Sequence, residues 1–176
     1  MFNGKLLEQH VIIWDKKDFN ELEESGFGKL LDDKLELALV EAMYLVNKGK
    51  MKVVKGKKSI SKKKFYDYCV ENERNFHARL MVYTDLRERG FLAKTGFKFG
   101  CDFRVYERGV KLKKGPKAEF EHTKWVVHAI PEEFTCSFSE LSRAVRLAQN
   151  IRTEMVWAVV DSEGDVTYYS IKRITP

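Results

Sequence analysis

The chain has 176 residues, 44% of them hydrophobic, and a formal net charge of +6. This length suits one large domain or two small ones, and the apolar content excludes a disordered chain. No apolar run approaches the roughly 18 residues of a membrane span, and the first residues lack the charged, apolar and small segments of a signal peptide. We therefore expect a cytoplasmic protein with no membrane partner.

Cysteine usage supports the same compartment. Cys69, Cys101 and Cys136 are scattered and odd in number, which suits a reducing environment. They form no metal-ligand pair, and the sequence shows no cluster of carboxylates of the metal-binding kind. We expect neither a metal nor another cofactor.

The positive charge is local. Nine lysines and no acids lie between Lys48 and Lys64, and nine lysines or arginines face four acids between Lys94 and Lys124. Basic segments of this kind bind polyanions through phosphate groups. A solvated lysine-rich surface, common in proteins from hot environments, explains the same composition. Charge alone leaves both interpretations open.

The first half of the chain is predicted to mix helices with short strands. Ser61 is a suitable N-cap, and Gly49 and Gly90 are suitable helix ends. Residues 5–14 are predicted to form a strand pair, or one strand, with a turn near residues 8–10. The other predicted elements are a short helix before the glycines at 26 and 28, a helix over 35–47, a short strand and a lysine-rich turn over 50–60, and helices over 62–73 and 76–89.

The pattern of the sequence changes after Gly90, from helices mixed with short strands to a series of strands. This change predicts two domains, 1–89 and 90–176. Period-two alternation in GFKFGCDFRVYERG and the apolar run WVVHAI indicate strands. An amphipathic helix over 137–153 follows, capped by Ser137 or Ser139, with Leu141, Val145, Ala148 and Ile151 on one face. A buried strand over 155–161, the turn DSEGD and a closing strand complete a β-β-α-β-β half. The fold class is α/β (α+β).

Tyr106 and His122 are the candidate catalytic pair. Tyr106 ends one predicted strand and His122 begins the next, so we expect the two side chains to meet in one cleft. RNA is cut when its 2′-hydroxyl attacks the adjacent phosphate, which requires a base, an acid and a positive group. A tyrosine, a histidine and a lysine or arginine supply these without a metal. Taken singly, Tyr106 also fits an ordinary half-buried strand residue and His122 a surface histidine.

Several segments of the sequence resemble those of a known protein family. KTGFKFGCDFRVYERG, EHTKWVV, LSRAVRLAQNIR and AVVDSEGDVTYY resemble, in this order, the C-terminal domain of archaeal tRNA-splicing endonucleases. VEAMYLVNKGKM and VYTDLRERGF resemble the N-terminal half of the same subunits. The resemblance spans nearly the whole chain.

The resemblance implies a small mixed α/β N-terminal domain and a C-terminal nuclease-like α/β domain with a central mixed sheet. It implies cleavage of precursor tRNA at both intron boundaries within a bulge–helix–bulge RNA, by a metal-independent, lyase-type reaction that leaves 2′,3′-cyclic phosphate and 5′-hydroxyl ends. Tyr106 matches the family's general base and His122 its general acid. Arg146 matches an arginine that grips a bulge base, and Lys172 or Arg173 matches a second basic residue.

One position departs from the family pattern. The third catalytic residue of the family is a lysine, and its place is taken here by Thr153, after Ile151 and Arg152. Arg152 or another nearby cation could substitute for it, the chain could be a weakened or structural subunit, or the residue could have been altered. The alternative function is therefore an RNA-binding or structural subunit with weak or no cleavage. A DNA-acting nuclease is a weaker alternative, because a paired-carboxylate metal site is missing from the sequence.

The turn with Asp161, Glu163 and Asp165 resembles the acidic loop that one subunit of the family inserts into a basic groove of another. An ordinary type I′ hairpin turn explains the same residues. The resemblance implies a homotetramer, or a heterotetramer with a second subunit type.

Overall fold

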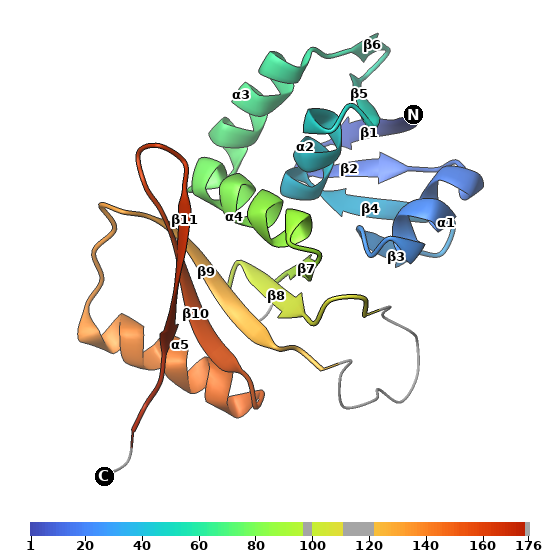
Figure 1. Cartoon of the computed structure of the whole chain (residues 1–176). Helices are drawn as coiled ribbons and strands as arrows, with labels where there is room; N and C mark the ends of the chain where they lie inside the picture. The colour runs from blue at the N-terminus through green and yellow to red at the C-terminus, as the bar shows by residue number, and fades with distance from the viewer. Residues whose placement is uncertain (97–99, 111–121, 175–176) are drawn as a thin grey trace. The chain divides into compact units, whose positions relative to one another are not determined.

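The computed structural model describes residues 1–96, 100–110 and 122–174 (Figure 1). The chain divides into two compact units, Met1–Leu80 and Met81–Pro176. The division lies within helix α4 (Phe76–Glu88), whereas the domain boundary predicted from the sequence lies near Gly90, just after that helix. Both units combine helices with a mixed sheet, so the predicted α/β (α+β) class is confirmed.

The first unit is built on a six-stranded sheet with the order β3-β4-β2-β1-β5-β6. Only the β1–β5 pair is parallel among the described pairs of this sheet. The strands are β1 (Phe2–Leu7), β2 (His10–Ile13), β3 (Lys29–Leu31), β4 (Lys34–Ala38), β5 (Met51–Lys55) and β6 (Lys58–Ser59), and the helices are α1 (Lys16–Glu24), α2 (Leu39–Asn47) and α3 (Lys62–Asn72). The predicted strand pair over 5–14 is confirmed as β1 and β2.

The predicted helix over 35–47 is wrong in its first turn. Leu35 and Leu37 are fully buried alternate residues of β4, and α2 begins only at Leu39. The buried Glu41 side chain marks the change, because its carboxylate accepts hydrogen bonds from the backbone N–H groups of Ala38 and Gly28, each at 3.0 Å. The same carboxylate thus caps α2 and holds the preceding loop.

Helix α3 begins as predicted. Ser61 is its N-cap, and the Ser61 hydroxyl accepts a hydrogen bond from the N–H of Lys64 at 3.4 Å. Phe65 and Cys69 are buried on its inner face. Burial, with the Glu73 charge second, raises the pKa of the Cys69 thiol to about 12. Cys69 is therefore a packing residue rather than a nucleophile.

The second unit is built on a five-stranded sheet with the order β11-β10-β9-β8-β7. Strands β9 and β10 are parallel and helix α5 connects them, while the other neighbours are antiparallel. The elements are β7 (Leu92–Thr95), β8 (Phe103–Tyr106), β9 (Trp125–Pro131), α5 (Phe138–Asn150), β10 (Glu154–Val160) and β11 (Val166–Ile171). Three strands precede α5, so the predicted β-β-α-β-β order misses one strand.

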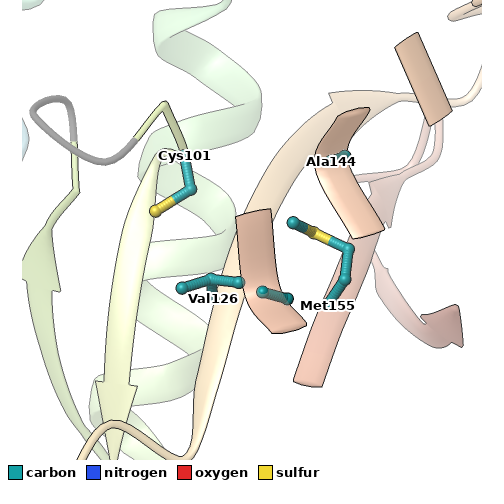
Figure 2. Close-up of a cluster of buried hydrophobic side chains, with 5 residues drawn as sticks. Cys101, Val126, Ala144 and Met155 are labelled. Carbon is teal, nitrogen blue, oxygen red and sulfur yellow. The ribbon is translucent and has the colours of Figure 1, made fainter. Parts of the chain in front are cut away.

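Helix α5 covers one face of this sheet (Figure 1). Its inner residues Ala144 and Ala148 join Cys101, Val126 and Met155 in a hydrophobic cluster (Figure 2). Of the predicted inner face, Val145 and Ala148 are buried, whereas Ile151 is 36% exposed because the helix has already ended. Ser137, one of the two predicted caps, is the N-cap.

The opposite face of the sheet packs on the part of α4 that belongs to this unit. The rings of Tyr83 and Phe103 lie 5.6 Å apart, and the Tyr168 hydroxyl donates a hydrogen bond to Asp85 at 2.7 Å. Burial, with Asp85 second, raises the pKa of Tyr168. Strands β8, β9 and β10 are therefore packed on both faces, which fixes the positions of their ends. None of the helices in the described ranges is long and apolar enough to span a membrane.

Candidate active site

Two neighbouring strands bring the candidate catalytic pair to one end of the second sheet. Tyr106 is the last residue of β8, and β8 runs antiparallel to β9 with Val105 opposite Trp125. The Lys124 N–H donates to the Val105 carbonyl at 2.8 Å, which continues the pairing one residue before β9. His122 precedes Lys124 by two residues, a span of at most about 7 Å of chain. Tyr106 and His122 thus lie at the same end of adjacent strands.

The two side chains differ in exposure. Tyr106 is 1% exposed, whereas His122 is exposed to solvent. His122 can therefore contact a large ligand directly. Tyr106 can do so only after a neighbouring group moves aside, because a buried hydroxyl cannot reach a ribose on the surface.

Lys124 places an ammonium group at the same strand end. Its Nζ lies 2.6 Å from Glu107 Oε2 and 4.5 Å from the centroid of the Trp125 ring. Its side chain is 36% exposed and that of Glu107 is 47% exposed. The sequence offers one signal for Lys124, its position two residues after the candidate acid His122.

Thr153 is joined to the same segment. Its hydroxyl donates a hydrogen bond to the Lys124 carbonyl at 2.6 Å, and its N–H bonds to Ala148 O at 2.9 Å. Arg152, the residue before it, has a positive φ of 54° and is exposed. The end of α5 is thus turned sharply into β10, and the Thr153 side chain is used to hold the chain beside His122.

The predicted RNA-binding residues lie after β11 and on α5. Lys172 follows β11 and forms an ion pair with Glu154 at 2.6 Å, and Glu154 is paired with Trp125 across β9 and β10. Arg173 lies next to Lys172 and is exposed. Arg146 is exposed on α5, where its Nε donates to Ser142 O at 3.4 Å.

The acidic turn lies at the other end of β10. Asp161 Oδ1 accepts the N–H groups of Glu163 and Asp165, each at 2.9 Å, and the Asp161 N–H donates to Asp165 O. Three residues lie inside this closure, and Gly164 has a φ of 90°. This is the three-residue hairpin turn rather than type I′. Glu163 and Asp165 are exposed, while Asp161 is occupied in holding the turn.

His128 of β9 has a structural partner in Asp102. His128 Nδ1 lies 3.6 Å from Asp102 Oδ2, and the same carboxylate oxygen accepts the Ala129 N–H at 2.9 Å. Within residues 1–96, 100–110 and 122–174, no group of three or more His, Cys, Asp or Glu side chains is placed to hold a metal ion.

Comparison with known families assigns both parts of the chain. Residues 2–66 match the model for the N-terminal domain of tRNA intron endonuclease, and residues 76–168 match the model for its catalytic C-terminal domain. The matches cover both units, in the order that the resemblance in the sequence implies.

Curated relatives agree. The chain is 40% identical to the tRNA-splicing endonuclease of Thermococcus gammatolerans over 148 residues, which cover 84% of this chain and 83% of the relative. It is 35% identical to that of Methanococcus maripaludis over 169 residues, covering 96% and 92%. It is 38% identical to that of Nanoarchaeum equitans over 148 residues, covering 84% and 96%. The chain therefore belongs to the tRNA intron endonuclease family.

Proposed function

We propose that this chain is an endonuclease subunit that cuts precursor tRNA at the intron boundaries of a bulge–helix–bulge RNA. The observation that carries the proposal is the position of Tyr106, His122 and Lys124 at the same end of two adjacent strands, in the domain that matches the family's catalytic model. The name of these relatives, tRNA-splicing endonuclease, supports the substrate class.

The reaction is an internal transfer of the phosphate ester. After the neighbouring group that covers it moves aside, Tyr106 takes the proton of the ribose 2′-hydroxyl, and the 2′-oxygen forms a bond to phosphorus. The bond from phosphorus to the 5′-oxygen breaks, and His122 gives a proton to that oxygen. The products are a 2′,3′-cyclic phosphate and a 5′-hydroxyl, so no oxidant, metal or water molecule is consumed.

The test is cleavage of an intron-containing precursor tRNA with the product ends mapped. We expect the intron to be released with a cyclic phosphate upstream and a 5′-hydroxyl downstream of each cut. The mature tRNA without an intron is the control and should remain intact. Products with 5′-phosphate ends would contradict the proposed chemistry.

Arg146 is proposed to grip an unpaired base of the bulge, since a guanidinium can stack on a splayed base. Replacing Arg146 with alanine is expected to weaken binding of the bulged RNA more than binding of a plain duplex of the same length. Filter binding across a salt series measures both, and affinity for each RNA should fall steeply with salt because phosphate contacts release counterions. Arg143→Ala, an exposed arginine of the same helix, is the matched control. Equal losses on both RNAs would reduce Arg146 to a surface charge.

The alternative function, an RNA-binding or structural subunit with weak or no cleavage, is motivated by Thr153, which stands in place of the family's catalytic lysine. If this chain cleaves only when mixed with another subunit type, the alternative holds, and the partner supplies the missing positive charge. A chain that cleaves alone excludes it.

We propose that the chain assembles through β11, the edge strand of the second sheet. Of its two tyrosines, Tyr168 is bound to Asp85, whereas Tyr169 is 55% exposed. An uncovered edge strand favours pairing with a second copy in a two-fold contact. Glu163 and Asp165 of the exposed turn would then meet a basic surface of a further subunit.

Light scattering at micromolar concentration is expected to show a tetramer, as homotetramer or, with a second chain, heterotetramer. Ser170→Pro should reduce it to smaller species, because proline in an edge strand removes a donor needed for pairing. A monomeric wild-type chain would contradict the assembly.

A further inference from the structure

We propose that Lys124 is the catalytic residue that neutralises the phosphate during cleavage, held in place by the hydroxyl of Thr153. This inference rests on the proposed function. A phosphate attacked by the 2′-oxygen gains negative charge in the transition state, so a preorganised cation beside it lowers the barrier. Thr153 carries no charge, so another nearby cation must neutralise the phosphate.

The backbone of Lys124 is fixed from both sides. Its N–H donates to Val105 O on β8 at 2.8 Å, and its carbonyl accepts the Thr153 hydroxyl at 2.6 Å. These two bonds join the strand that ends at Tyr106 to the start of β10. Lys124 therefore lies between the end of β8 and Thr153, two residues after His122, and its position depends on Thr153.

The Lys124 side chain is held without being locked. Its ammonium lies over the rings of Trp125 and Phe91, at 4.5 Å and 5.6 Å from their centroids. Its ion pair with Glu107 is 2.6 Å long, but both side chains are more than a third exposed, so water screens the attraction. A phosphate group can replace the Glu107 carboxylate as the partner, while the aromatic rings keep the lysine stem in place.

The other candidate cations are less well placed. Lys172 follows β11, three strands from β8, so at the usual strand spacing it lies about 14 Å from the end of β8. Arg152 is exposed in a turn at positive φ. Arg108 lies over Phe91 at 4.8 Å, in the turn after β8. Lys124 is the cation whose backbone is bonded both to β8 and to Thr153.

The test compares Lys124→Met with wild type at saturating protein on precursor tRNA, in single-turnover cleavage. Methionine keeps the apolar stem over Trp125 and removes the charge. We expect the cleavage rate to fall by about 10²–10³, with little change in affinity for a substrate that carries 2′-deoxy groups at both cut sites. Lys124→Arg should recover part of the rate, and Glu107→Gln should retain it.

Lys5→Met is the matched control, because Lys5 also lies over a tryptophan ring, that of Trp14, in the first unit. It should cleave at the wild-type rate. The inference is overturned if Lys124→Met cleaves like wild type, or if it loses affinity for the RNA and not cleavage rate. Arg108→Met tests the other cation over Phe91, and a loss of rate in that variant alone would also overturn the inference. If wild type itself does not cleave while binding the RNA, the proposed function fails instead.

Discussion

Replacing His122 with alanine is expected to lower the single-turnover cleavage rate by about 10²–10⁴ and to leave RNA binding nearly unchanged. The expected loss is that of one general acid, because the 5′-oxygen would leave without a proton from the protein. His122 is exposed at the end of a strand pair, so its removal should cost little stability. The measurement is cleavage at saturating protein, with thermal unfolding as the check on folding.

His10→Ala is the control for the loss of an exposed histidine. His10 lies in the first unit, 3.6 Å from Glu36, far along the chain from the catalytic-domain match. It should cleave at the wild-type rate. If His122→Ala cleaved as fast as His10→Ala, His122 would be a surface histidine and the acid would have to be another group.

Replacing Tyr106 with phenylalanine is expected to cause a loss of similar size, about 10²–10⁴, by removing the base and keeping the ring. Tyr106 is almost fully buried, so Phe preserves the packing that Ala would destroy. A higher pH should not restore the activity, because no side-chain hydroxyl remains at the position. The measurement is again the single-turnover rate, followed across pH.

Tyr66→Phe tests whether the loss of any packed tyrosine hydroxyl is enough. The Tyr66 hydroxyl is bonded to His77 at 3.0 Å in the first unit, so the variant should keep full activity. Wild-type cleavage by Tyr106→Phe would show that Tyr106 is a core residue and that its burial, rather than catalysis, explains it.

Local signals in the sequence, such as helix caps and the spacing of apolar residues, predict most of the helices and strands. Ser61 marks the start of α3 by capping it with its side chain, and Gly49 follows the end of α2 with a positive φ. Both effects involve only neighbouring residues, so the sequence alone reveals them. The error at Leu35–Ala38 arises because this segment fits two periods. Leu35, Ala38 and Leu39 have helical spacing, whereas Leu35, Leu37 and Leu39 have strand spacing, and the long-range contact of Glu41 with Gly28 accompanies the strand. Such a tertiary contact leaves no trace in periodicity.

The site is predictable in part. The strand-end positions of Tyr106 and His122 follow from the alternation of apolar residues, since antiparallel neighbours return the chain to the same end. The contact of Thr153 with Lys124 joins residues 29 positions apart, and it depends on the register of β9 against β10. Register is a property of the assembled sheet, so the role of Lys124 needs the structure.

The most direct test of the account is cleavage of an intron-containing precursor tRNA by the purified chain alone, in EDTA, with the RNA folded beforehand. If Tyr106, His122 and Lys124 perform the chemistry, both intron boundaries are cut, at the rate seen when Mg²⁺ is present, and the upstream products end in a cyclic phosphate. Intact RNA in EDTA that is cut only after a divalent metal is added would contradict the account.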